Sequence, residues 1–134
     1  MQHKPNSFLE AAVSEIENGK RVKVLIEGSS MLPFIVGGKD IVEIEPCTQI
    51  TIGDVLLFFY KGHYIIHRLI VCNHGLFTFR GDANFKKSET ITVEGILGRV
   101  VAIYKNGRTS ATIPNRKVPL TNRLRALINL LKRM

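Results

Sequence analysis

The sequence predicts a mainly β protein, a coiled or barrel-like antiparallel sheet with one helix before it and one helix after it. Short runs rich in Val, Ile, Thr and Phe alternate with turns that contain Gly, Asn or Asp. No crossover helix is indicated between consecutive runs, which favours antiparallel pairing. The 134 residues are 45% hydrophobic and 22% charged, which suits one folded domain with a core.

Two helices are expected, one near each end of the chain. Ser7 and Glu10 have the spacing of a capping box, and the apolar stripe that follows predicts a helix over about 7–18. Residues 120–134 place an apolar face beside a basic one. We therefore divide the chain into an N-terminal helix (1–19), a β-domain (20–113) and a basic amphipathic C-terminal helix (114–134), all within one domain. The first apolar stripe consists of Phe8, Leu9, Ala12, Val13 and Ile16.

Six segments between the helices have the composition of strands, and their turns have specific signals. Lys61-Gly62 is typical of a two-residue hairpin, and a second turn is expected at 73–75. Gly95 and Gly98 are expected to mark bulges or bends. The predicted strands cover 21–27, 40–45, 55–60, 63–72, 76–80 and, as a longer β-rich stretch, 90–104.

The net charge of +8 belongs to the C-terminal part of the chain. All 11 acidic residues precede residue 105, whereas eight of the 19 basic residues follow residue 104. Such a tail can attach to an anionic membrane through residues 120–134, or it can pack its leucines on the sheet. Nucleic acid is a less favoured partner, because aromatic residues are not interleaved with the basic ones.

Compartment and redox state follow from what the sequence contains. The acidic N-terminal segment has no continuous apolar region of a secretory signal, and no run approaches the ~18 apolar residues of a membrane span. We therefore expect a cytoplasmic protein, either free or peripheral to the membrane. Cys47 and Cys72 are expected to stay reduced.

One serine has a setting suited to a nucleophile. Ser30 lies in the segment GSSMLP (28–33), between a strand end and a turn that Pro33 restricts. Its neighbour Gly28 lets another backbone approach closely. A serine hydroxyl still needs a base beside it, and a third group to orient that base.

His67 is the best candidate for the base, and Asp82 for the group that orients it. His67 lies in the middle of a strand, among Ile and Leu side chains that favour its neutral form. Asp82 follows a strand in the segment RGDAN (80–84), where a carboxylate can accept the second ring N–H of a histidine. Each residue also has an ordinary structural interpretation, as a core histidine and as a turn aspartate.

Four motifs in order resemble the signal peptidase I / LexA-type serine peptidase superfamily. They are GSSMLP (28–33), GDV (53–55), IIHRLI (65–70) and GDAN (81–84), and GILGRVV (95–101) is similar to the strand that closes the sheet of that family. The resemblance covers about residues 20–104. It implies a serine endopeptidase that acts on a peptide or protein substrate, without a cofactor or metal.

The resemblance also implies residue roles. Ser30 would be the nucleophile, His67 the base at a position where many members have Lys, and Asp82 the group that orients His67. Arg68, on the opposite face of its strand, is expected to have a structural or partner-binding role. Residues beside the nucleophile would form an apolar lip for substrate. These expected substrate-binding residues are Ser29, Met31, Leu32, Pro33 and Phe34.

Two other functions stay open. A LexA-like regulator would cleave its own chain, but the sequence lacks the Ala-Gly and Cys-Gly bonds that such proteins cut, and no DNA-binding domain precedes the sheet. A non-enzymatic basic β-domain would bind nucleic acid or protein through the tail. No metal site is expected, because His63 and His67 lie four residues apart on one strand.

Overall fold

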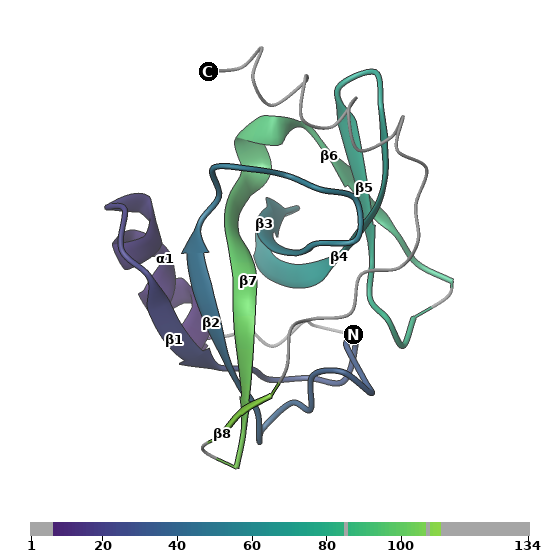
Figure 1. Cartoon of the computed structure of the whole chain (residues 1–134). Coiled ribbons are helices and arrows are strands. Elements are labelled where there is room, and N and C mark those ends of the chain that lie inside the picture. Colours follow the sequence, from purple (N-terminus) through teal and green to yellow (C-terminus); the bar gives the residue numbers. More distant parts are fainter. Residues whose placement is uncertain (1–6, 85, 107, 111–134) are drawn as a thin grey trace.

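One helix and one antiparallel sheet make up the computed structural model, which describes residues 7–84, 86–106 and 108–110. The sheet order is β1-β2-β7-β3-β4-β5-β6, and β8 pairs with β7 (Figure 1). This confirms the mainly β, antiparallel class, whereas the helix predicted over 114–134 lies outside the described residues. The elements are α1 (Ser7–Glu17), β1 (Val22–Leu25), β2 (Ile41–Pro46), β3 (Val55–Tyr60), β4 (His63–Asn73), β5 (Leu76–Arg80), β6 (Glu89–Ile91), a 3-10 helix (Val93–Gly95), β7 (Ile96–Lys105) and β8 (Arg108–Ser110).

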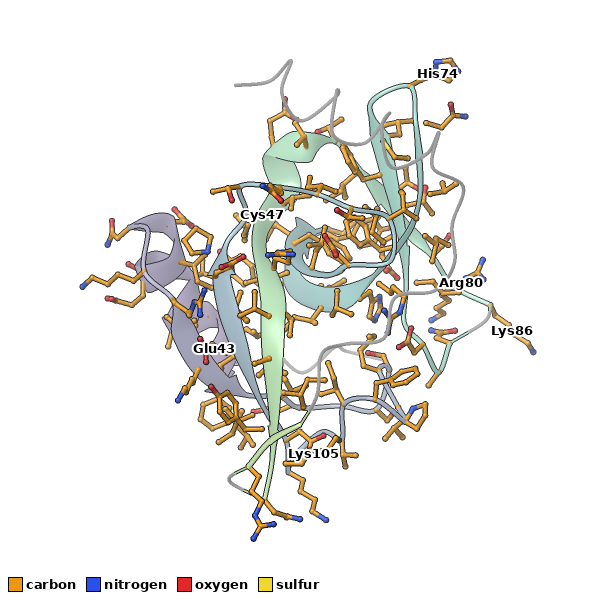
Figure 2. The ribbon with its side chains drawn as sticks, viewed as in Figure 1. Glu43, Cys47, His74, Arg80, Lys86 and Lys105 are labelled. Atoms are coloured by element: carbon orange, nitrogen blue, oxygen red, sulfur yellow. The ribbon has the colours of Figure 1, made fainter. Side chains whose placement is uncertain are left out.

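Two tight hairpins set the register of the central strands. Lys61 and Gly62 have φ values of 47° and 85°, the left-handed conformation that a type I′ turn requires at both central residues. The turn at the tip of the β4–β5 hairpin contains His74 in the same region, with φ of 51° (Figure 2). The first hairpin pairs Leu56 with His67, so the face that His67 occupies is fixed by local turn chemistry.

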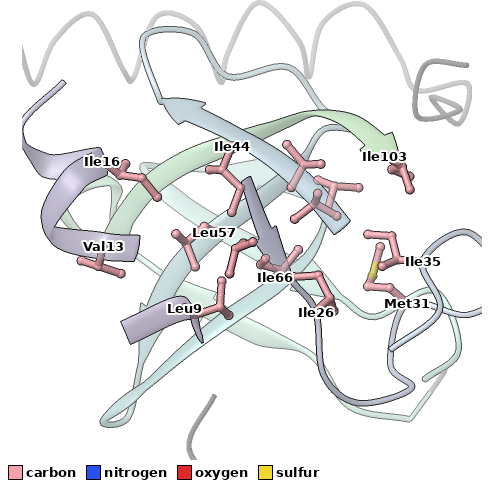
Figure 3. Close-up of a cluster of buried hydrophobic side chains, with 14 residues drawn as sticks. Leu9, Val13, Ile16, Ile26, Met31, Ile35, Ile44, Leu57, Ile66 and Ile103 are labelled. Atoms are coloured by element: carbon pink, nitrogen blue, oxygen red, sulfur yellow. The ribbon is translucent and has the colours of Figure 1, made fainter. Parts of the chain in front are cut away.

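The sheet curls around two apolar clusters. One lies between α1 and strands β1, β2, β3, β4 and β7, where Leu9, Val13 and Ile16 supply the buried face of the helix (Figure 3). Phe8, which the sequence pattern placed in the same stripe, is instead 45% exposed. The other cluster fills the inside of the curl and contains Phe58, Leu69, Phe77 and Phe79 among others, with the rings of Phe58 and Phe79 stacked at 4.0 Å.

Gly98 on β7, where a bulge or bend is expected, lies at a register shift in the β3–β7 pairing, and it also marks a close approach between β7 and β2. A Cβ atom at this position would lie 2.7 Å from Ile44 Cγ2 and 3.0 Å from the carbonyl oxygen of Glu45. Only glycine therefore lets β7 approach β2 this closely. The expected bend at Gly95 is the end of the 3-10 helix.

Both cysteines are free thiols. Burial, together with the nearby Asp54 carboxylate, raises the pKa of Cys47 to about 12. A thiol in that state is a poor nucleophile and a poor metal ligand. Within the described residues, no helix has the length and apolar character needed to cross a bilayer.

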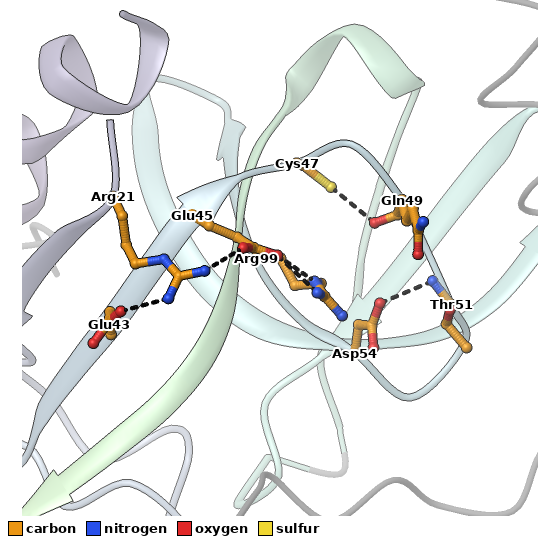
Figure 4. Close-up of polar contacts among 8 residues, drawn as sticks. All are labelled: Arg21, Glu43, Glu45, Cys47, Gln49, Thr51, Asp54 and Arg99. Carbon is orange, nitrogen blue, oxygen red and sulfur yellow. Dashed lines mark hydrogen bonds and ion pairs between the residues drawn. The ribbon is translucent and has the colours of Figure 1, made fainter. Parts of the chain in front are cut away.

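Alternating acids and bases run across the outer face of β2 and its neighbours (Figure 4). Arg21 donates to Glu43 and to Glu45, at 2.9 Å each, and Arg99 on β7 donates to Glu45 at 2.7 Å. Tyr104 donates its hydroxyl to the second oxygen of Glu43. These bonds join β2 to β7 and to the chain just before β1. They therefore stabilise the part of the sheet that contains β1, β2 and β7, the strands that α1 contacts.

This network predicts a loss of stability in acid. The Tyr104 hydroxyl hydrogen bond lowers the pKa of Glu43, and the Arg99 hydrogen bond lowers the pKa of Glu45. In the unfolded chain these carboxyls bind protons at an ordinary pKa of about 4.3, before the folded protein does. The free energy of unfolding should therefore fall as the pH drops from about 5 through the lowered pKa values.

Urea denaturation between neutral pH and the acid limit of folding measures this dependence. The double variant Glu43→Gln/Glu45→Gln should be less stable than wild type at neutral pH and should lose less further stability in acid. Parallel curves for the two proteins would contradict the role of this network.

Candidate functional site

Ser30 lies in the loop that joins β1 to β2, as the sequence predicts. Backbone hydrogen bonds hold this loop, including Leu32 N to Ser29 O at 3.2 Å and Ile35 N to Met31 O at 3.0 Å. The backbone carbonyl of Ser30 accepts a hydrogen bond from Ala83 N at 2.9 Å. The loop that carries Ser30 is thus attached to the loop that follows β5.

His67 projects from β4 toward the inside of the curled sheet. Its Nδ1 lies 2.6 Å from Glu89 Oε1, and both side chains are buried. The ring also contacts Phe58 edge-on, with centroids 6.3 Å apart. A carboxylate on Nδ1 favours the tautomer that carries its proton there, which leaves Nε2 as the acceptor.

Gly81 is the point at which Ser30 and His67 meet. A Cβ atom at Gly81 would lie 3.0 Å from Ser30 Cβ, 3.0 Å from His67 Nε2 and 2.6 Å from the Ser30 carbonyl oxygen. Ser30 Cβ and His67 Nε2 are therefore separated by no more than the sum of the first two distances. Only a residue without a side chain fits between them, which gives the glycine of the GDAN segment a specific purpose.

The Ser30 hydroxyl makes no hydrogen bond to His67 within the described part of the chain. Rotation about the Cα–Cβ bond of Ser30 moves this hydroxyl, while the backbone bond from Ala83 keeps its carbonyl in place. Hydrogen bonds between catalytic groups are often long before substrate binds. Ser30 and His67 are therefore neighbours across Gly81, without a hydrogen bond between them.

Asp82 is paired with Arg68 and His67 Nδ1 with Glu89, so the hydrogen bond expected between Asp82 and His67 is not formed within the described residues. Its two carboxylate oxygens accept hydrogen bonds from Arg68 Nε and Nη2 at 2.8 Å and 2.7 Å. His67 and Arg68 are successive residues of β4, so their side chains face opposite sides of the strand, and Asp82 lies on the side of Arg68. Glu89 on β6 has the position that was assigned to Asp82.

The Arg68–Asp82 pair packs against the loop that carries Ser30. Arg68 is 1% exposed and also donates to the Gly53 carbonyl at 2.8 Å. The Phe34 ring covers its guanidinium, 5.4 Å from the ring centroid. Asp82 N lies 3.5 Å from Met31 Sδ, next to the nucleophile. The structural role expected for Arg68 is therefore to brace the segment that carries Ser30.

A pocket of about 770 Å³ opens over Ser30 and His67. Of the five residues expected to bind substrate, Ser29 and Met31 line this pocket, whereas Leu32, Pro33 and Phe34 do not. Leu32 is exposed, and Phe34 packs on Arg68. The apolar side of the pocket is therefore formed by buried core side chains and not by the expected lip of residues 31–34. Among these core side chains, Met31 lies beside Ile35 (Figure 3). The floor that they form consists of Leu9, Ile26, Met31, Ile35 and Ile66, and Glu10, Glu27, Lys87 and Glu89 also line the pocket.

Glu89 is the neighbour of His67 in the candidate site that sequence reasoning missed. It lies seven residues after Asp82, in a short segment where one acid among Ser, Thr and Ile resembles any exposed strand position. Its inward orientation follows from pairing with Phe79 on β5, whose side chain belongs to the inner cluster. The signal that could have found it is an acidic residue paired, on the neighbouring strand, with a residue that faces the core, as Glu89 is paired with Phe79.

Within residues 7–84, 86–106 and 108–110, no group of three His, Cys, Asp or Glu side chains is arranged to hold a metal ion. Comparison of the chain with protein-family models, with curated proteins and with solved structures gives no match. The site is therefore described by its own geometry alone: a serine, a histidine and a glutamate line one pocket of a curled β-sheet, and the histidine is bonded to the glutamate.

Proposed function

We propose that this chain is a serine endopeptidase of the signal peptidase I / LexA type, with Ser30, His67 and Glu89 as its catalytic set. One observation carries the proposal: Ser30 Cβ and His67 Nε2 lie against the same glycine, at 3.0 Å from its Cβ position, while His67 Nδ1 is bonded to Glu89. This is the order nucleophile, base and orienting acid that acyl transfer uses on unrelated folds.

In the proposed reaction, Ser30 Oγ attacks the carbonyl carbon of the scissile peptide bond while His67 Nε2 accepts the hydroxyl proton. Glu89 stabilises the imidazolium that forms, through the hydrogen bond from Nδ1. His67 then gives the proton to the leaving amine as the C–N bond breaks. Water attacks the resulting ester with His67 again as base, which releases the acid product and restores Ser30.

The peptide substrate would lie in the pocket above Ser30. The floor of buried apolar residues suits small or apolar side chains, and the polar rim leaves main-chain groups of the substrate with hydrogen-bonding partners. The backbone N–H of Ser30 is the first candidate for stabilising the oxyanion. The Arg68–Asp82 pair would keep this segment in place during the reaction.

A fluorophosphonate probe tests the proposal, because it reacts with a serine that a base activates. Wild type should be labelled at Ser30, and Ser30→Ala should not be labelled at all. His67→Ala should react more slowly by about 10²–10⁴-fold, the usual contribution of a general base. Intact-mass spectrometry and peptide mapping measure the rate and the site.

Ser14→Ala is the matched control, because it removes an exposed serine of α1 and should be labelled like wild type. Thermal melts would establish that each variant is folded. Equal labelling of wild type, Ser30→Ala and His67→Ala would refute the proposed function.

A further inference from the structure

Asn84 is part of the pocket wall and has no role in the mechanism proposed above. Its loop is attached to the nucleophile: Asn84 N donates to Gly81 O at 2.9 Å, and the preceding residue, Ala83, donates to Ser30 O at 2.9 Å. Any group that Asn84 presents is therefore held at a fixed position relative to Ser30.

The side-chain amide of Asn84 has a defined orientation. Two backbone N–H groups, of Lys86 and Lys87, point at one of its atoms at 3.3 Å each. Because both of these groups are donors, the atom they meet must be the oxygen, Oδ1. The amide is planar, so Nδ2 and its two hydrogens face away from the Lys86–Lys87 backbone. Within the described ranges, Nδ2 donates to no protein acceptor.

We propose that Asn84 Nδ2 donates a hydrogen bond to a main-chain carbonyl of the bound peptide, which makes Asn84 a substrate-positioning residue. The proposal rests on the serine peptidase function above and adds how the substrate backbone is held. A peptide in a pocket presents a carbonyl oxygen at every residue, and a donor with a fixed orientation binds one at little entropic cost. The interaction does not depend on the side chains of the substrate.

Two probes of Ser30 separate this role from the chemistry. A butyl fluorophosphonate has no peptide carbonyl, whereas acetyl-Ala-Ala-Ala diphenyl phosphonate has several. Asn84→Asp keeps an oxygen for the two backbone N–H groups and removes the Nδ2 donor. It should react about tenfold more slowly with the peptidyl probe, the effect of losing one such hydrogen bond, and at the wild-type rate with the butyl probe.

Lys86→Gln is the charge-matched control, because it also lowers the net charge by one. Lys86 points away from the rest of the molecule (Figure 2), does not line the pocket and keeps its backbone N–H in the variant. This variant should react with both probes at the wild-type rate. Asn84→Ala, which removes donor and acceptor together, should lose at least as much rate with the peptidyl probe as Asn84→Asp.

The outcomes are distinct. Wild-type rates for Asn84→Asp with the peptidyl probe would overturn the proposal, and a slow Asn84→Ala beside a normal Asn84→Asp would assign Asn84 only to the stability of its loop. Equal slowing with both probes would place the effect on Ser30 itself, which also overturns it. If neither probe reacts with wild type at Ser30, the peptidase function fails, whatever the variants do.

Discussion

Replacing Glu89 with Gln is expected to slow acylation of Ser30 by about 10²–10⁴-fold while the fold stays intact. Glu89 Oε1 lies 2.6 Å from His67 Nδ1 in a buried setting, where the carboxylate accepts a hydrogen bond from the ring N–H. A glutamine amide has nearly the same shape, but it neither enforces the Nδ1–H tautomer nor stabilises the imidazolium with a charge. The rate of fluorophosphonate labelling measures the loss.

Two further variants and one spectrum distinguish this role from a packing role. Glu89→Asp retains the carboxylate and should recover part of the rate, whereas Glu17→Gln, an equal charge change on an exposed face of α1, should react like wild type. The ¹⁵N spectrum of the His67 ring should show the Nδ1–H tautomer in wild type and lose it in Glu89→Gln. An unchanged tautomer together with an unchanged rate would remove Glu89 from the catalytic set.

Asp82→Asn is expected to lower the free energy of unfolding by about 3–5 kcal/mol, the usual cost of removing one partner of a buried ion pair. The Arg68 guanidinium is almost fully buried, and both carboxylate oxygens of Asp82 are bonded to it. The neutral amide removes the negative charge that Arg68 Nε and Nη2 contact. Urea denaturation measures the change, with labelling of Ser30 as a second readout because the pair braces the nucleophile loop.

The double variant Arg68→Met/Asp82→Leu should be more stable than the sum of the two single substitutions predicts, since it removes the charge and its partner together. The tautomer of His67 should be unaffected in Asp82→Asn. A stable Asp82→Asn with an altered His67 tautomer would instead restore Asp82 to the role that the sequence suggested for it.

Local chemistry made much of the sheet predictable. The strands predicted over 55–60 and 76–80 have those bounds in the structure, because hairpin turns and apolar runs define them from within. The position of β7 in the sheet could not be predicted from its own residues. It lies between β2 and β3, and nothing within residues 96–105 specifies which earlier strands it joins. That pairing depends on how the whole sheet curls.

Part of the candidate site was also predictable from the sequence, and part was not. Ser30 and His67 are candidates from the sequence because four ordered motifs resemble the signal peptidase I / LexA-type superfamily, whereas a serine in a turn and a histidine on a strand are ordinary patterns by themselves. The third member could not be chosen in this way. Asp82 lies in the turn after β5 and is bonded to Arg68, whereas the β5–β6 register pairs Glu89 with the inward-facing Phe79 and so places it beside His67.

The sequence by itself predicted most of the strands and their tight turns, because these depend on neighbours along the chain, but it merged β6, the 3-10 helix and β7 into one stretch. Only the tertiary structure decided that Gly81 brings Ser30 and His67 together and that Glu89 holds the histidine. Those contacts join residues from four separate segments, and their geometry exists only once the sheet has curled around its core.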